Sequence, residues 1–254
     1  MKRPYILITN DDGYDSKGIR SLWEAMSTLG DVIVVAPDAH RSGMAAAITP
    51  YPPLRAEKIK DEDGNVWYKC TGTPVDCVKL AFAQLLDRKP DLVVSGINHG
   101  PNAGINVAYS GTMGAAFEGC IQKVPSIGFS LCTMDEDADF MVAKEVCSSI
   151  TKKILQEGLP DYTCLNVNIP YCKDVKGIRL CRQTDSVWID EFSKEFNEKQ
   201  EVVYPMGGEV IILEEQDSYS DLWALKEGWV AVVPVLMDRT DYSYIEANKN
   251  LFES

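Results

Sequence analysis

The chain has 254 residues, of which 45% are hydrophobic, and its formal net charge is −13. It is long enough to bury a substantial core, and its acidity argues against a nucleic-acid duplex or an acidic membrane as partner, because both require a basic face. The excess acid lies in the second half, since residues 1–130 hold 14 acidic and 13 basic side chains whereas residues 131–254 hold 24 and 12.

The sequence gives no sign of a membrane span or a secretory signal. No stretch approaches the roughly 18 consecutive apolar residues that a spanning helix needs, and the apolar run that follows the first four residues is too short for a signal peptide. The eight cysteines form no C-x-x-C pair and stand mostly in apolar runs, where reduced, buried thiols are expected. We therefore expect a cytoplasmic protein.

Apolar, β-branched runs alternate with helical patterns along the first 170 residues. Strands are predicted at residues 5–9, 32–36, 91–96, 125–130 and 164–169. Helices are predicted at residues 16–29, 73–86, 111–122 and about 135–157, the second with Thr73 as its N-cap and Pro74 at its first position. Alternation of this kind predicts an α/β fold with a doubly wound, mostly parallel sheet.

The alternation fades beyond about residue 175. A charged stretch, IDEFSKEFNEKQEVVY, is followed by a late strand-like run, WVAVVPVL, and a polar tail. We expect a single α/β domain over residues 1–254, in which residues 1–180 form the core and residues 181–254 add a hairpin excursion, the late strand and a C-terminal arm for oligomerisation.

Oxygen-bearing side chains follow the first three predicted core strands, in loops that would share one edge of the sheet. Asp11 and Asp12 follow the first strand, Ser42 the second and Asn98 the third. Ligands bind at the carboxyl ends of strands in open parallel sheets, so these donors could converge. An all-oxygen set suits one divalent ion, Mg²⁺ or Mn²⁺, and zinc is less favoured because no cluster of cysteine and histidine accompanies it.

The third of these loops also carries features of a phosphate site. Gly111 and Thr112 stand where a helix is predicted to begin, so unpaired backbone N–H groups and the positive end of the helix dipole are available to an anion. The preceding glycines allow close approach to a ligand, and Asn98, Asn102 and Asn106 supply neutral amide groups. A glycine- and asparagine-rich loop by itself is also typical of plain turns.

Plainer roles fit the same residues. Asp11 and Asp12 could cap the helix that begins near Ser16, Ser42 could be a turn hydroxyl and Asn98 could form an Asx-turn. The occurrence of all four at successive strand ends favours the cation site.

The sequence does not decide the roles of several other residues of interest. His40 and His99, the only histidines, stand beside Ser42 and Asn98 and could assist the leaving group, although a catalytic role is the weaker interpretation. Arg41 could clamp a phosphate or be a solvated charge, and Trp188 could pack or stack on a base.

The motifs ILITNDDG, VVAPDAHRSGMAAAIT, TGTPVDCVKLA and DLVVSGINHGPNAGINVAYSGTMGAAFEG, in this order and spacing, resemble the SurE family of metal-dependent nucleotidases. The resemblance implies a Rossmann-like core, a divalent metal and hydrolysis of nucleoside 5'- and 3'-monophosphates by a phosphoric monoester hydrolase. It implies metal ligands at Asp11, Asp12, Ser42 and Asn98. It implies substrate and phosphate contacts at Gly43, Asn98, Asn102, Ser110, Gly111 and Thr112.

The resemblance also implies a homodimer or homotetramer, because in this family the C-terminal arm exchanges between subunits. Residues 181–201 depart from the basic hairpin segment that the family usually carries, so the resemblance says little about base specificity.

The implied mechanism is attack of a metal-activated water on the phosphate, in which Asp11 and Asp12 hold the metal and Asp12 is the better candidate for the base. Two alternatives stay open. A non-catalytic nucleotide-binding protein would bind without hydrolysis, and a haloacid-dehalogenase-type phosphatase would use an aspartyl nucleophile, although its Asp-x-Asp motif is not matched by adjacent Asp11 and Asp12. A dinucleotide oxidoreductase is disfavoured because no G-x-G-x-x-G follows the first strand.

Overall fold

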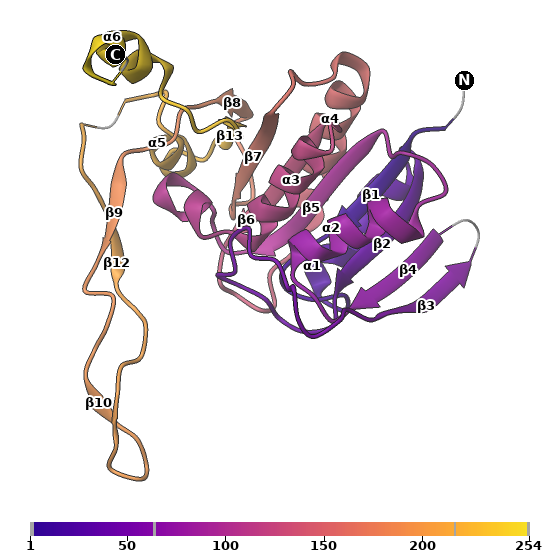
Figure 1. Cartoon of the computed structure of the whole chain (residues 1–254), viewed down its shortest axis with the longest axis horizontal. Helices are drawn as coiled ribbons and strands as arrows, with labels where there is room; N and C mark the ends of the chain where they lie inside the picture. Colours follow the sequence, from indigo (N-terminus) through magenta and orange to yellow (C-terminus); the bar gives the residue numbers. More distant parts are fainter. Residues whose placement is uncertain (1–2, 63–64, 216, 253–254) are drawn as a thin grey trace.

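The computed structural model describes residues 3–62, 65–215 and 217–252, and its centre is a nine-stranded sheet (Figure 1). The strands of the sheet are β1 (Tyr5–Thr9), β2 (Asp31–Pro37), β3 (Ala56–Glu62), β4 (Asn65–Cys70), β5 (Leu92–His99), β6 (Ser126–Cys132), β7 (Thr163–Pro170), β8 (Ile178–Leu180) and β13 (Val230–Leu236). They lie in the order β3-β4-β2-β1-β5-β6-β7-β13-β8.

The predicted core strands are confirmed as the parallel centre of this sheet. β2, β1, β5, β6 and β7 pair with one another in parallel, in that order. Leu7 of β1 stands opposite Ile33 of β2 on one side and Val93 of β5 on the other. After β1 the chain builds β2 on one side of it, and it later returns to place β5 on the other side. Where the strand order reverses in this way, a crevice is expected at the carboxyl end of the central strand, here β1.

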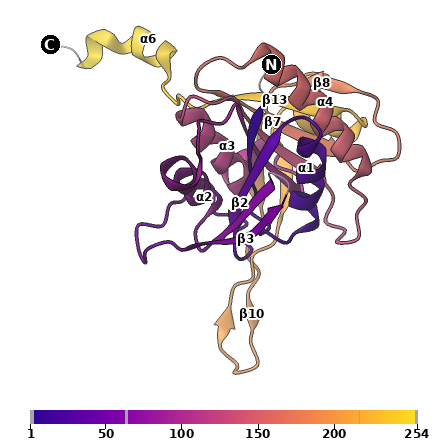
Figure 2. The same ribbon diagram turned by 90° about the vertical axis from the view of Figure 1, so that its right-hand side faces the viewer.

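Helices cover both faces of the sheet, as predicted for a doubly wound fold. The helical segments are α1 (Lys17–Ser27), α2 (Pro74–Leu80), the π-helical turn η1 (Ala81–Leu85), the 3-10 turn η2 (Gly104–Ala108), α3 (Gly111–Ile121), α4 (Met141–Glu157), α5 (Asp221–Lys226) and α6 (Tyr242–Phe252). Figure 2 shows α1 and α4 on one side of the strands and α2 and α3 on the other.

Side chains of β1 alternate between the two resulting cores. Ile6 and Ile8 pack in the cluster that contains Ile19 of α1, whereas Leu7 packs in the cluster that contains Val78 of α2. All of these side chains are fully buried, or nearly so. The period of two along the strand therefore supplies both faces of the sheet with apolar surface, whose burial stabilises the fold.

The N-cap predicted at residue 73 is confirmed. The Thr73 side chain accepts a hydrogen bond from the Asp76 backbone N–H at 3.1 Å, and the Asp76 carboxylate accepts one from the Thr73 N–H at 2.9 Å. This reciprocal pair is a capping box, and Pro74 occupies the first turn, where no N–H is required.

The helix predicted from about residue 135 begins later, at Met141. The preceding aspartates bond locally instead, because Asp135 accepts from the N–H of Asp137 and Asp139 accepts from the N–H of Met141. Such side-chain bonds to the backbone compete with helical hydrogen bonds, which explains the delayed start.

The antiparallel pair β3–β4 at one edge of the sheet was not among the predicted strands. β3 reads AEKIKDE, in which apolar residues are too few to form the continuous run that marks a buried strand. An exposed edge strand of this kind carries charges on both faces, so composition alone does not reveal it.

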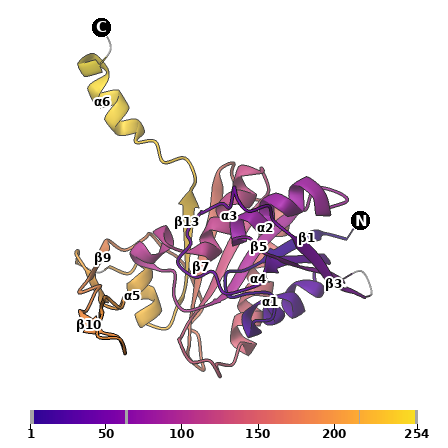
Figure 3. The same ribbon diagram turned by 60° about the horizontal axis from the view of Figure 1, so that its bottom comes forward.

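The second half of the chain contains the predicted hairpin, late strand and arm. β9 (Ser186–Ile189) pairs with β12 (Glu209–Ile212), and β10 (Glu195–Phe196) pairs with β11 (Val202–Val203), both antiparallel. This hairpin extends away from the body of the molecule (Figure 1), and α6 leads away at another point (Figure 3). The late strand β13 joins the sheet antiparallel to β7. The assignment of residues 1–254 to one domain stays a prediction.

None of the helices in the described ranges combines the length and the apolar character required to cross a bilayer.

The close approach of α1 to β5 depends on a glycine. A Cβ atom added to Gly18 would lie 2.0 Å from the backbone oxygen of Ile97, next to Asn98. We expect Gly18→Ala to lower the free energy of unfolding by about 1 to 3 kcal/mol, because this backbone cannot move away without disturbing the sheet. Urea unfolding followed by circular dichroism measures the change. Gly207→Ala, where the added methyl would meet open space, serves as the control, and equal stability of the two variants would contradict the prediction.

Candidate functional site

A cavity of about 560 Å³ opens where the loops after β1, β2 and β5 meet. Its lining residues are Asp11, Ser42, Gly43, Asn98, His99, Gly100, Pro101, Asn102, Asn106, Tyr109, Ser110, Met134, Trp188, Glu191 and Met206. Three of the four predicted metal ligands therefore share one cavity, at the expected edge of the sheet.

Asp11 is the most deeply buried charged group of the site, with 4% of its surface exposed. The Thr112 hydroxyl donates to its Oδ1 atom at 2.6 Å. A Cβ atom on Gly111 would lie only 2.9 Å from its Oδ2 atom, so a glycine is needed for this approach. Burial, and then the nearby charge of Asp12, raise the pKa of Asp11 to about 6. The ionised carboxylate is thus poorly compensated by the protein itself.

Asp12 lies beside the cavity without lining it. Its Oδ2 atom accepts a hydrogen bond from the His99 backbone N–H at 3.2 Å, and its Oδ1 atom lies 3.7 Å from Nδ1 of His40. Burial raises the pKa of Asp12 as well. The first residues of α1 do not use either aspartate as a cap, because the Ser16 hydroxyl accepts from the Ile19 N–H. The plainer capping role for Asp11 and Asp12 is therefore wrong.

The Asn98 side chain is oriented by its own loop. Its Nδ2 atom donates to the Gly100 backbone oxygen at 2.8 Å. This bond leaves the amide oxygen, Oδ1, as the end that can act as a ligand.

The loop that carries Ser42 and Gly43 is tied to the other two loops by backbone bonds. The Arg41 N–H donates to the Asp11 backbone oxygen at 2.7 Å, and the Ala45 N–H donates to the Tyr109 oxygen at 3.1 Å. The three loops are thus joined before any ligand binds.

The residues predicted to contact phosphate divide into two groups. Four of them line the cavity, namely Gly43, Asn98, Asn102 and Ser110. The Ser110 hydroxyl also caps α3 by accepting from the Met113 N–H at 3.1 Å. Gly111 and Thr112 do not line it, because they pack behind the carboxylate of Asp11. Their roles at phosphate stay predictions, and the structure adds a role for both in placing Asp11.

The side chains of His40, His99 and Arg41 differ in what they can reach. His99 lines the cavity and stacks edge-on against Phe140, whereas the His40 side chain is 66% exposed and does not line the cavity. The Arg41 guanidinium donates to the Asp38 carboxylate at 3.4 Å and to the Thr71 backbone oxygen at 3.3 Å. Arg41 therefore contacts the neighbouring loop and does not line the cavity.

The sequence alone did not assign several other residues of the cavity lining. Tyr109 lies within one of the quoted motifs but was given no role, and Met134, Glu191 and Met206 lie outside those motifs. Trp188 was the one residue of the hairpin for which base stacking was considered, and it lines the cavity.

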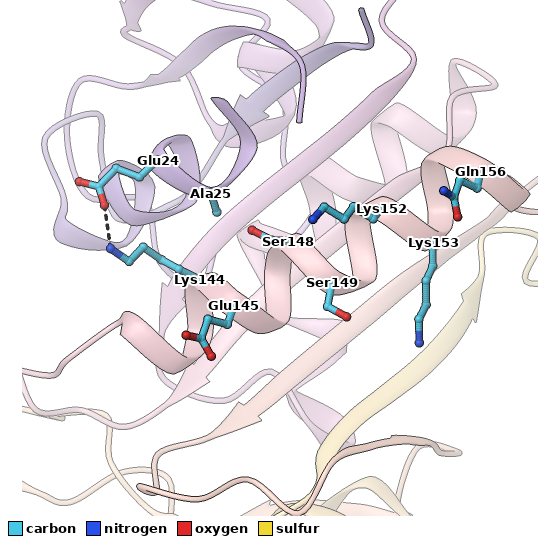
Figure 4. Close-up of a pocket in the computed structure, with 9 residues that line it drawn as sticks. All are labelled: Glu24, Ala25, Lys144, Glu145, Ser148, Ser149, Lys152, Lys153 and Gln156. Carbon is cyan, nitrogen blue, oxygen red and sulfur yellow. Dashed lines mark hydrogen bonds and ion pairs between the residues drawn. The ribbon is translucent and has the colours of Figure 1, made fainter. Parts of the chain in front are cut away.

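A second hollow, of about 700 Å³, lies over α1 and α4 (Figure 4). Its lining residues are Glu24, Ala25, Lys144, Glu145, Ser148, Ser149, Lys152, Lys153 and Gln156. Lys144 pairs with Glu24 at 2.8 Å, so these two charges compensate one another. No residue from the loops after β1, β2 or β5 lines it, and we assign it no function.

The donor set of the first cavity fits a hard cation. No lysine or arginine lines it among the residues that the structure describes, although Asp11 and Glu191 do. Within the same ranges, no three side chains of the types His, Cys, Asp and Glu are grouped as a metal site, so hydroxyl and amide oxygens would have to complete the coordination. Carboxylate, hydroxyl and amide oxygens are donors that suit Mg²⁺ or Mn²⁺.

Comparison with known proteins agrees with the motif resemblance. The sequence model of the family described as Survival protein SurE matches residues 6–190. A relative from Bacteroides fragilis, named 5'-nucleotidase SurE, is 45% identical and covers 98% of this chain and 98% of its own length. Another of the same name, from Christiangramia forsetii, is 49% identical and covers 96% of this chain and 95% of its own.

Among solved structures, the crystal structure of the SurE protein from Aquifex aeolicus matches with a TM-score of 0.84 at 40% identity. The match covers 98% of this chain and 99% of that chain. The predicted fold class and the predicted family resemblance are confirmed.

The cost of burying Asp11 predicts a stability effect with a defined pH dependence. The folded-state pKa lies above the unfolded value of 3.8, so ionisation of Asp11 destabilises the fold, fully above pH 6 and not at all well below pH 4. In metal-free buffer at pH 8 we expect Asp11→Asn to raise the free energy of unfolding by about 2 to 3 kcal/mol, and by about half as much at pH 5.

Urea unfolding with chelator present, at both pH values, tests this expectation. Asp15→Asn, in the same loop but exposed, should change the stability at neither pH. A destabilising effect of Asp11→Asn at pH 8 would show that the carboxylate is compensated by contacts within the protein.

Proposed function

This chain belongs to the SurE family, and on that basis we propose that it hydrolyses nucleoside monophosphates to a nucleoside and phosphate. Relatives named 5'-nucleotidase, matched over nearly their whole length, make the chain a phosphoric monoester hydrolase. The proposal extends to dependence on a divalent metal, with the 5'-monophosphates as main substrates and the 3'-monophosphates as further ones.

One observation carries the metal dependence: the cavity lining has acidic groups but, among the described residues, no lysine or arginine. A phosphate monoester is itself an anion, so its approach to Asp11 and Asp12 is electrostatically opposed unless a cation lies between them.

Asp11, Asp12, Ser42 and Asn98 are the residues that would hold the cation. When bound, Mg²⁺ or Mn²⁺ would neutralise phosphate charge and lower the pKa of a water molecule. Two observations support this assignment. The pKa of Asp11 is raised, which shows that its ionised carboxylate is poorly compensated, and the hydrogen bond of Asn98 uses its Nδ2 atom and leaves its amide oxygen available to a cation.

Residues of the chain supply the other parts of the site. Ser110 begins α3 at the cavity wall, so the positive end of the helix dipole favours a phosphate there. Gly43 and Asn102 line the same space and would bound the phosphate.

Asp12 is the candidate for the general base. His99 holds its Oδ2 atom, whereas Oδ1 lies 3.7 Å from His40, which is longer than a hydrogen bond. Oδ1 is therefore the atom available to take a proton from water.

Phosphate release from a panel of 5'- and 3'-nucleoside monophosphates, with Mg²⁺, Mn²⁺ or chelator, tests the proposal. We expect release by the wild type only with metal, and a fall of about 100-fold or more in kcat/KM for Asp12→Asn, because a cation ligand and the candidate base are lost together. Asp15→Asn, an exposed carboxylate of the same loop, is the matched control and should keep wild-type activity.

The other outcomes identify the alternatives. Nucleotide binding without phosphate release under any metal would identify a binding protein. A covalent phospho-aspartate trapped during turnover would identify an aspartyl nucleophile. Release that persists in chelator would contradict the metal dependence.

We further propose that the chain forms a homodimer or homotetramer through its C-terminal arm. α6 leads away from the body (Figure 3), and its Ile245 and Leu251 are 44% and 68% exposed. Apolar side chains exposed on an extended helix are typical of a surface that another subunit covers.

Size-exclusion chromatography with light scattering tests the assembly. We expect the wild type at two or four times 28.2 kDa and Ile245→Glu at a lower mass, because a buried charge opposes the contact. Asn250→Glu adds the same charge at an exposed polar position of α6 and should leave the mass unchanged. A monomeric wild type would contradict the proposal.

A further inference from the structure

Two asparagines interrupt the apolar sequence of β7, which reads TCLNVNIP. Asn166 and Asn168 are 2% and 0% exposed. The intervening residues Leu165, Val167 and Ile169 pack in the same apolar cluster as Ile8 of β1, so the two asparagines face the other side of the sheet. Burial of an amide is costly unless its polar atoms are hydrogen-bonded. The partners of these two amides therefore indicate what they contribute.

Both asparagines bind the backbone of a single loop residue, Asn102. The Asn102 N–H donates to Oδ1 of Asn168 at 2.8 Å, and Nδ2 of Asn166 donates to the Asn102 backbone oxygen at 2.8 Å. Nδ2 of Asn168 also donates to Oδ1 of Asn166 at 3.0 Å, which fixes the orientation of both amides. The two side chains thus satisfy the backbone N–H and C=O of Asn102, as a neighbouring strand would.

The Asn102 side chain is held by the next strand of the sheet. Its Nδ2 atom donates to the hydroxyl of Ser130 in β6 at 2.8 Å, and Ser130 is 1% exposed. In the register of the sheet, Ser130 stands opposite Asn168 on one side and opposite Asn98 of β5 on the other. The residues that hold Asn102 therefore lie in the same row of the sheet as Asn98, a predicted metal ligand.

The loop between Asn98 and Gly104 is attached at three places. The Gly100 N–H donates to the Leu131 backbone oxygen at 2.9 Å, and the Gly104 N–H donates to the Asp221 carboxylate at 2.9 Å. Asn102 stands between them. The φ angles of Gly100 and Gly104 are 109° and 57°, and glycines of this kind are costly to order because the unfolded chain has many conformations at them. The bonds to Asn102 therefore keep the middle of the loop in one conformation.

We propose that Asn166 and Asn168 are positioning residues for the hydrolase site, which act through Asn102 on the loop that carries Asn98. The inference rests on the proposed function, because this loop supplies a cation ligand and a phosphate contact there. Neither asparagine belongs to the described lining of the cavity, so neither acts by touching the ligand. Hydrogen-bonded amides on a rigid strand fix the residues in front of them, and a displacement of about 1 Å in a site can lower a rate about 100-fold.

Removal of the amide of Asn168 tests the proposal. Asn168→Ala leaves the buried N–H of Asn102 without its acceptor. With Mn²⁺ present, we expect kcat/KM for adenosine 5'-monophosphate to fall about 10- to 100-fold. Hydrogen exchange of the backbone amides of residues 98–104, followed by mass spectrometry, should become about tenfold faster. Ser126→Ala is the matched control, because it removes a buried hydroxyl that donates to the Val124 oxygen at 2.9 Å, at the other end of β6 from Ser130, and it should change neither quantity.

Asn168→Asp separates positioning from folding. A protonated carboxyl group has an acceptor and a donor where the amide has them, whereas an ionised one would turn two acceptors toward Asn102 and Asn166. Burial disfavours the ionised form, so the protonated form is restored as the pH falls. We expect the ratio of kcat/KM for Asn168→Asp to that for the wild type to rise about fivefold or more from pH 8 to pH 5.5. The titration of Asp11 and Asp12 is common to both enzymes and cancels in the ratio.

Circular dichroism at the assay temperature establishes that each variant is folded, so the ratio reports geometry and not the amount of folded protein. A folded Asn168→Ala enzyme with wild-type kcat/KM would overturn the inference, and so would an Asn168→Asp ratio that is the same at both pH values. If Asn168→Ala does not fold, the pH dependence of Asn168→Asp decides alone.

The exchange measurement keeps this inference separate from the proposed function. If the wild type releases no phosphate with any metal, the proposed function fails. Faster exchange at residues 98–104 in Asn168→Ala, but not in Ser126→Ala, still shows in that case that β7 positions the loop. Unchanged exchange in Asn168→Ala would show that the loop is held without β7, and the inference would be wrong.

Discussion

The negative charge of Asp11, held almost completely out of water at the end of β1, is the constraint around which the first half of the chain is arranged. A buried carboxylate requires hydrogen-bond donors or a cation, and the described protein atoms meet this need only in part. The Thr112 hydroxyl reaches one of its oxygens, and Gly111 has no side chain that would block the other. The part of this charge that the protein leaves uncompensated raises the pKa of Asp11, and it would favour a cation at the proposed site.

Most of this arrangement could be predicted from the sequence because it is local to strand ends. The predicted strands at residues 5–9 and 91–96 are rich in apolar residues, and polar residues follow both of them closely, so a parallel sheet brings Asp11 and Asn98 to one edge. The interactions between these loops could not be predicted from the sequence in the same way. The local sequence GTMG does not indicate that Gly111 and Thr112 pack behind Asp11, because that contact joins positions about one hundred residues apart.

The parts that escaped prediction did so for related reasons. The edge strand β3 has charged residues in place of an apolar run, since an exposed edge is stabilised against aggregation by charge. The start of α4 depended on Asp135 and Asp139 forming local bonds, which compete with a helix only in the folded context. The wall that contains Trp188 is assembled from the hairpin and from η2, and no periodicity connects two segments that meet only in three dimensions.

The lining of the cavity comes from different parts of the chain. The acidic and amide oxygens of the proposed cation site lie in the first half, whereas Trp188, Glu191 and Met206 come from the hairpin. The hairpin is joined to the first half through Asp221, whose carboxylate binds Gly104 on one side and Thr184 on the other. Because this junction is buried while the hairpin beyond it is exposed, residues of the hairpin can change the cavity lining without disturbing Asp11. We therefore expect the departure of residues 181–201 from the usual family pattern to alter the shape of the cavity while the loops that keep the family motifs stay in place.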